Sequence, residues 1–138
     1  MPIQIIWGND TDASNKEIEK IIALHVSKEW SNLNVSKFNG DDPKQIFQAL
    51  DEILTPPLGD GSRVVIIKNS PILNFKNDDI SNKFEINSKI IPSSTYLILQ
   101  NIHKPDSRMK ATKLIDSLSK KDIASESSFN LPSIWDKN

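Results

Sequence analysis

The hydrophobic positions of the chain fall into short apolar runs separated by stretches in which apolar residues recur at helical spacing. Runs of the first kind predict strands, and recurrence every three or four residues predicts helices. The predicted strands are residues 3–7, 35–38, 63–68 and 95–100. Two predicted helices follow start signals at residues 9–12 and 39–43 and carry their apolar residues within 18–26 and 46–54. Two more cover residues 78–90 and 107–118, and a further edge strand is a candidate within residues 123–137.

Strands and helices alternate along the whole chain, which predicts an α/β fold with a mostly parallel sheet flanked by helices. Crossovers of this type are right-handed and return each strand to the same sheet. Residues 64–67 form a continuous apolar run, as expected for an inner strand covered on both faces. A length of 138 residues suits a single domain. We assign residues 1–130 to this domain and residues 131–138 to the start of a following segment.

Residues 54–63 join a proline-rich loop to the start of that buried strand, and they are the part of the chain most informative about function. Pro56 and Pro57 fix their φ angles, remove two backbone donors and disfavour helix at the residues before them. Gly59 and Gly61 then allow the chain to turn. Leu58 is therefore held on a stiff loop. There it either packs against its own core, which is the commoner arrangement, or anchors a binding partner.

The charge and cysteine content exclude several classes of protein. With 25% charged residues and a formal net charge of -1, the chain has no global basic field that would indicate nucleic acid binding. The absence of cysteine excludes disulfides and thiolate metal sites. The first residues lack the features of a secretory signal, and no apolar stretch approaches the length of a membrane span. We therefore expect a cytoplasmic protein without membrane contact.

The turn after the first predicted strand, residues 8–12, lacks the groups that hold a nucleotide. Nucleotide-binding turns use glycines, a lysine and a serine or threonine to cradle phosphates and magnesium. Here one glycine remains, no lysine occurs before Lys16, and Asp10 and Asp12 would repel a triphosphate. We expect no bound ATP and no cofactor. Asp10 and Asp12 are better explained as an N-cap and a first-turn residue than as magnesium ligands.

Basic residues gather around the last predicted helix. Lys104 and Arg108 fall between the end of a strand and the start of that helix. This is a favourable place for a phosphate contact, although a solvated basic face is the commoner explanation. Trp7, Trp30 and Trp135 are not interleaved with basic residues, which favours core or boundary positions over stacking on bases.

The two histidines do not form a metal site. His25 lies on a predicted helix and His103 lies just after a predicted strand. Neither has a carboxylate or histidine at metal-ligand spacing, so we expect no bound metal.

Three segments of the chain match one family in order and at compatible spacing. They read Ile-Ile-Trp-Gly-Asn-Asp at residues 5–10, Leu-Thr-Pro-Pro-Leu-Gly at residues 54–59, and Lys-Pro-Asp-Ser-Arg-Met-Lys-Ala-Thr-Lys-Leu at residues 104–114. With these segments the chain resembles, from end to end, the N-terminal domain of the delta subunit of the bacterial DNA polymerase III clamp loader, especially forms of the cyanobacterial kind.

The resemblance implies an AAA+-like fold with a degenerate nucleotide site and no ATPase activity. It also implies a subunit that grips the sliding clamp and helps to open it during DNA replication, while other loader subunits bind ATP. The clamp-binding element of the family maps onto Leu54, Thr55, Pro56, Pro57 and Leu58, with Leu58 as the anchor.

Two departures from the family change what we expect of this chain. The family often has a phenylalanine after the anchoring leucine, and Gly59 stands in its place here. The lid and helical collar of the family are absent after residue 138, so the chain resembles a fragment that lacks the collar through which other loader subunits assemble. Contact with DNA would be indirect or through a weak basic patch.

Two other classes of function remain open. One is a nucleotide-binding or receiver-like switch domain with an atypical first turn. A receiver needs a phosphorylatable aspartate at the end of its third strand, and the chain has Lys68 and Asn69 there. The other is a scaffold domain that contacts another loader subunit through its helices.

Overall fold

The structure, a computed structural model, describes residues 2–132 and contains one sheet of five strands in the order β2-β3-β4-β1-β5. All four strand pairs in these residues are parallel, which confirms the predicted parallel α/β fold. The elements are β1 (Ile3–Trp7), α1 (Thr11–His25), η1 (Lys28–Trp30), α2 (Ser31–Asn34), β2 (Val35–Asn39), α3 (Pro43–Glu52), β3 (Arg63–Lys68), α4 (Asp78–Ser88), β4 (Thr95–Asn101), α5 (Lys110–Lys120) and β5 (Ala124–Ser128).

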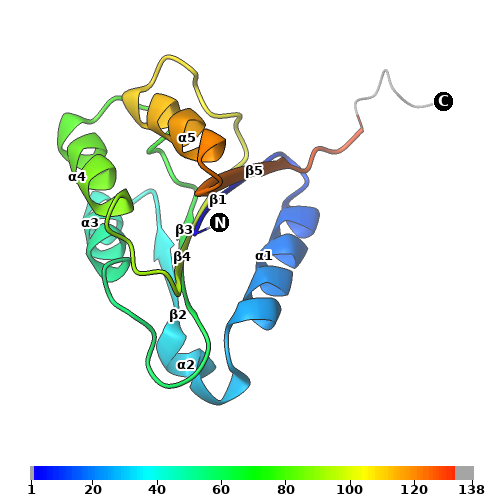
Figure 1. The fold of residues 1–138 in the computed structure, drawn as a ribbon. Coiled ribbons are helices and arrows are strands. Elements are labelled where there is room, and N and C mark those ends of the chain that lie inside the picture. The colour runs from blue at the N-terminus through cyan, green and yellow to red at the C-terminus, as the bar shows by residue number, and fades with distance from the viewer. Residues whose placement is uncertain (1, 133–138) are drawn as a thin grey trace.

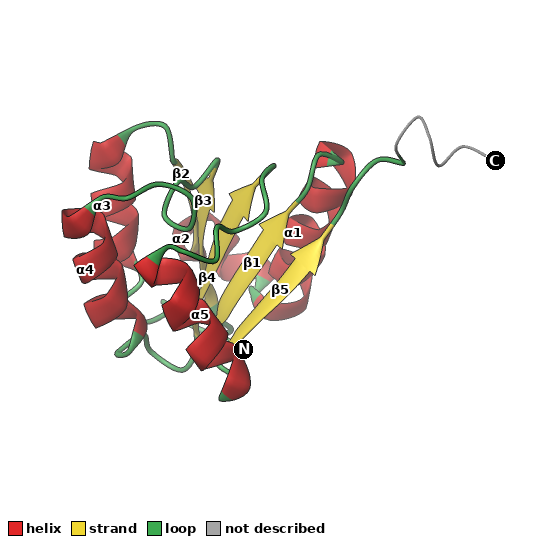
Figure 2. Cartoon of the chain, turned by 90° about the horizontal axis from the view of Figure 1, so that it is seen from above, coloured by secondary structure: helices red, strands yellow, loops and turns green. Residues whose placement is uncertain are grey.

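The sheet lies between two unequal layers of helices (Figures 1 and 2). Helices α3, α4 and α5 cover one face, and α1 covers the other. Side chains of β3 alternate between the two cores, because successive residues of a strand point to opposite faces. Val65 and Ile67 pack toward α3, α4 and α5, whereas Val64 and Ile66 pack toward α1, and all four are fully buried. The continuous apolar run is therefore an inner strand, as predicted.

Short-range capping signals set the start of three helices. The side chain of Asp10 accepts a hydrogen bond from Ala13 N at the start of α1, and Asp42 accepts one from Lys44 N at the start of α3. Asn77 accepts one from Ile80 N at the start of α4. Each of these bonds satisfies a backbone donor that has no partner within the helix. The predicted N-cap role of Asp10 is confirmed.

The structure differs from the sequence prediction in several places. Helix α3 ends at Glu52, two residues before the predicted end. Helix α5 begins at Lys110 instead of residue 107, because Asp106 accepts the backbone N–H of Arg108 and holds residues 106–108 in a turn. Helix α4 ends at Ser88, two residues before the predicted end, where the chain approaches Pro92. The short helices η1 and α2 were not predicted at all.

Because every strand pair is parallel, the loops that precede the strands lie at one edge of the sheet and those that follow them lie at the opposite edge. Residues 54–62 lead into the amino end of β3. The turn after β1 and the segment with Lys104 and Arg108 after β4 lie at the carboxyl edge. The fold therefore places the predicted clamp-binding loop and the predicted phosphate contact at opposite ends of the sheet.

Candidate functional site

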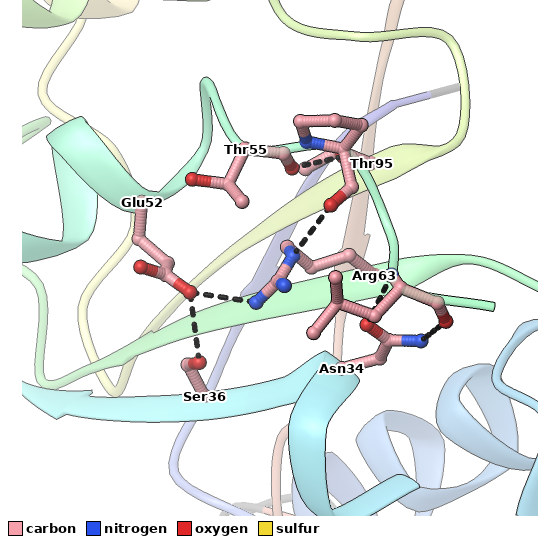
Figure 3. Close-up of polar contacts among 8 residues, drawn as sticks. Asn34, Ser36, Glu52, Thr55, Arg63 and Thr95 are labelled. Atoms are coloured by element: carbon pink, nitrogen blue, oxygen red, sulfur yellow. Dashed lines mark hydrogen bonds and ion pairs between the residues drawn. The ribbon is translucent and has the colours of Figure 1, made fainter. Parts of the chain in front are cut away.

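Residues 54–58 lie in the connection between α3 and β3, and side chains from neighbouring strands hold the backbone of this loop (Figure 3). The Thr95 hydroxyl of β4 donates a hydrogen bond of 2.9 Å to the carbonyl oxygen of Thr55. Arg63 Nε, at the first residue of β3, donates one of 3.3 Å to the carbonyl oxygen of Pro56. The carbonyl groups that precede Pro56 and Pro57 therefore both accept hydrogen bonds from side chains of the sheet.

Leu58 is held by a third side chain, that of Asn34 at the end of α2 (Figure 3). Asn34 Nδ2 donates to the carbonyl oxygen of Leu58 at 2.7 Å, and Leu58 N donates to Asn34 Oδ1 at 2.8 Å. The amide side chain therefore pairs with both backbone groups of Leu58, as a neighbouring strand would. Asn34 is fully buried, and its two hydrogen bonds to Leu58 are partly buried.

Arg63 is the charged centre of the network. It is only 4% exposed, and its Nη1 lies 2.6 Å from Glu52 Oε1 at the end of α3. Ser36 Oγ of β2 lies 3.5 Å from the same carboxylate oxygen. A buried guanidinium needs such a partner, since an unpaired charge in the interior is strongly destabilising. Arg63 consequently joins α3, the loop and β3 into one unit.

The apolar side chains of the loop point outward although its backbone is fixed. Leu58 is 47% exposed and Leu54 is 37% exposed. Pro56 is exposed as well. Leu58 is therefore not enclosed by its own sheet, and the loop presents an apolar tip whose conformation is already set.

The turn after Leu58 requires glycine at two positions. Gly59 and Gly61 have φ angles of +64° and +82°, in the left-handed region that side chains disfavour. A Cβ atom at residue 59 would overlap the indole of Trp30, and one at residue 61 would lie 2.8 Å from Ser27 N. The glycine at position 59 is thus dictated by the close approach of η1 to the loop.

The turn after β1 has its backbone donors occupied by the chain itself. Gly8 N donates to Asn101 O, Asn9 N donates to the side chain of Asn130, and Asp10 N donates to Phe129 O. A Cβ atom at Gly8 would overlap the backbone of Phe129. The segment after β5 therefore fills the space, and this segment together with the end of β4 accepts hydrogen bonds from the N–H groups that would otherwise face a phosphate.

The histidines lie at different ends of the fold. His25 stacks on Tyr96 with ring centroids 4.5 Å apart, and its carbonyl oxygen accepts from Ser62 N near the amino edge of the sheet. His103 follows β4 at the carboxyl edge. Within residues 2–132, no group of three or more histidine, aspartate or glutamate side chains is arranged to hold a metal ion.

Arg108 is already paired with a carboxylate. Its Nε and Nη2 donate to the two oxygens of Asp106 at 3.1 and 2.9 Å. The side-chain hydrogen bond from Arg108, together with its backbone hydrogen bond and its charge, lowers the pKa of Asp106 from the ordinary 3.8 to about 2. Lys104 is exposed, and its carbonyl oxygen accepts from Asn74. A phosphate at this place would have to compete with Asp106 for Arg108.

Sequence reasoning missed Asn34 and assigned Trp30 only to a core or boundary position. Trp7 and Trp30 are both partly buried, which places them at boundaries, and Trp135 lies outside the described residues. A buried asparagine just before a strand carries no sequence signal that names its partner, because Leu58 lies 24 residues away.

Comparison with known proteins supports one family. The sequence model of the family described as "DNA polymerase III, delta subunit" matches residues 5–123. Among solved structures, the chain is similar to the Bacillus subtilis DNA clamp loader delta protein, with a TM-score of 0.79 and 23% identity. The similarity covers 96% of this chain and 39% of that one. No curated protein matches the sequence. No helix within residues 2–132 is long and apolar enough to cross a membrane.

Proposed function

Because the chain belongs to the DNA polymerase III delta subunit family, we propose that it binds the sliding clamp through Leu54, Thr55, Pro56, Pro57 and Leu58 and helps to open it, without hydrolysing ATP itself. The chain spans 39% of the B. subtilis delta protein, so the proposal concerns the part played by this domain. Its setting would be DNA replication in the cytoplasm.

The observation that carries the proposal is an exposed Leu58 side chain on a fixed backbone. Leu58 is 47% exposed, while Asn34 bonds to both its N–H and its carbonyl oxygen. A loop held in its bound conformation loses little entropy when it docks, so a small contact can give useful affinity. An apolar anchor that enters a pocket usually dominates the binding energy of such a contact. We assign this role to Leu58.

Opening of the clamp sets a further condition. A bound protein shifts an equilibrium between two states only by the difference in its affinity for them. The loop would therefore bind the opened clamp more tightly than the closed ring. A rigid loop suits this role, because a flexible one would adapt to both forms of the clamp.

The turn after β1 supports the absence of ATP hydrolysis. Its N–H groups at Gly8, Asn9 and Asp10 already donate to protein acceptors, and it offers no lysine to a phosphate. ATP would be handled by other subunits of the loader, which would assemble with this one through regions outside this chain.

Contact with DNA would be indirect or through the weak basic patch that includes Lys104 and Arg108. Lys104 and Arg108 lie at the carboxyl edge of the sheet, far from the loop, and Arg108 is bonded to Asp106. Any phosphate contact there would act separately from clamp binding.

The experiment that tests the proposed function is capture of the chain by immobilised sliding clamp from the same organism. Retention on the clamp, and its loss in the Leu58→Asp variant, is the expected result. A chain that is folded but not retained would contradict the proposal.

A further inference from the structure

Trp30 stands outside the hydrophobic core. The partly buried apolar side chains that pack against the two core clusters of the described residues are Trp7, Phe38, Phe47, Ile91, Leu114, Ile123, Ile22, Val35, Tyr96 and Phe129. Trp30 is not among them, although a large aromatic side chain normally contributes its area to a core. Its position therefore calls for another explanation.

The indole of Trp30 lies against the loop directly after Leu58. Its Cε2, Nε1 and Cδ2 atoms occupy the space where a Cβ atom of Gly59 would be. The left-handed φ of Gly59, +64°, turns the backbone so that the ring fits against it. The ring of Trp30, 29 residues earlier in the chain, thus fills the space that a side chain at residue 59 would take.

The short segment of η1 and α2 supports the loop at two adjacent residues. Asn34, four residues after Trp30, bonds to the backbone of Leu58, and the Trp30 ring packs on Gly59. Trp30 remains partly exposed, and Leu58 beside this contact is 47% exposed. Trp30 immediately precedes α2, and α2 and the loop lie at the same end of the sheet (Figure 1), so Trp30 and Leu58 come from neighbouring segments of the chain.

We infer that Trp30 is a direct clamp-binding residue, which supplies the aromatic part of a composite surface whose aliphatic part is Leu58. This inference rests on the proposed function and adds a contact from η1 to it. Trp30 and Leu58 would contact the same apolar pocket region of the sliding clamp. Tryptophan is among the residues that contribute most when buried at interfaces, because it combines large apolar area with few rotatable bonds.

The direct test labels the chain with 5-fluorotryptophan and follows its fluorine NMR signals as unlabelled sliding clamp is added. Trp→Phe variants assign the three signals. A soluble gadolinium chelate broadens exposed signals, so it reports burial of each ring. The Trp30 signal is expected to shift and to become protected from the chelate in the complex.

Trp7 is the internal control for this measurement. Its indole N–H donates to Glu126 at the carboxyl edge of the sheet, away from the loop, so its signal should keep its position and its accessibility. Trp30→Ala is expected to weaken clamp affinity at least tenfold. Trp30→Phe, which keeps an aromatic ring on Gly59, should weaken it less than threefold.

The outcomes separate this inference from the proposed function. Suppose that the labelled chain binds the clamp and Leu58→Asp abolishes binding, but the Trp30 signal stays accessible to the chelate. The inferred contact by Trp30 is then wrong, whereas the proposed clamp binding through Leu58 is supported. If the folded, unsubstituted chain does not bind at all, both are wrong. The fluorine signals come from the unsubstituted chain, so the result does not depend on whether Trp30→Ala folds.

Discussion

Asn34 pairs with both backbone groups of Leu58, at 2.7 Å to the carbonyl oxygen and 2.8 Å from the N–H. A side chain thereby does at this loop what a neighbouring strand does in a sheet. The consequence is that Leu58 has a fixed backbone and a free side chain at once. A leucine tucked under its own sheet would have no surface to offer, and a leucine on a mobile loop would lose entropy on binding.

Replacing Asn34 with alanine should therefore weaken both the fold and clamp binding. The change leaves two backbone groups of Leu58 without partners, which costs about 1–3 kcal/mol for a buried polar group. We expect the free energy of unfolding to fall by about 2 kcal/mol in urea denaturation, and clamp affinity to fall as the loop loosens. Asn32→Ala is the matched control, because Asn32 is exposed on the same helix. Equal effects of the two substitutions would contradict the assigned role of Asn34.

Replacing Arg63 with methionine should destabilise the protein more than Asn34→Ala does. Arg63 is 4% exposed, and its removal breaks the ion pair with Glu52 and the hydrogen bond to Pro56. Breaking a buried pair costs about 3–5 kcal/mol, and we expect the lower end because Glu52 remains partly open to water. A double-mutant cycle with Glu52→Gln measures the coupling. A coupling energy near zero would show that the Arg63–Glu52 ion pair does not stabilise the protein.

The Asp106 carboxyl should titrate at about 2. Its pKa in the folded chain lies below that of the unfolded chain, so its stabilising contribution is fully present above pH 3.8 and is lost as the pH falls through 2. Carbon-detected NMR of the carboxyl group measures this midpoint. Arg108→Ala should raise the midpoint toward 3.8, because the largest cause of the shift is the side-chain hydrogen bond from Arg108. An unchanged midpoint in that variant would rule out the Arg108 pairing in solution.

Isothermal titration of the chain with ATP and magnesium should give no heat of binding. The N–H groups of Gly8, Asn9 and Asp10 donate to Asn101, Asn130 and Phe129, and residues 8–12 contain no lysine. Saturable heat at micromolar to millimolar ATP would instead favour the alternative of a nucleotide-binding switch domain.

The fold was predictable because its signals are local. The apolar run of residues 64–67 predicted an inner strand. Asp10 indicated the start of α1, and its side chain accepts a hydrogen bond from the N–H of Ala13, three residues later. Prediction failed where a local contact outweighs helix propensity. The side chain of Asp106 accepts a hydrogen bond from the N–H of Arg108, so α5 begins later than predicted. The helices η1 and α2 are too short to show a periodic pattern.

The site was predictable only in part, since its support is non-local. Pro56 and Pro57 indicate a stiff loop from sequence alone. Whether Leu58 faces its own core depends on the residues beside the loop. These are Asn34 and Trp30, which lie 24 and 28 residues before Leu58 in sequence. The buried position of Arg63 also follows from partners on other elements, Glu52 and Pro56.

The affinity of Leu58→Asp for the sliding clamp, measured by surface plasmon resonance, tests the central claim most directly. Ile102→Asp is the matched control, because Ile102 is 44% exposed against 47% for Leu58 and lies at the opposite edge of the sheet. Loss of a central anchor costs about 2 kcal/mol or more, so Leu58→Asp should weaken binding by roughly 30-fold or more. Ile102→Asp should bind normally, and both variants should keep their melting temperatures within a few degrees. Unchanged clamp affinity in a folded Leu58→Asp variant would contradict the account.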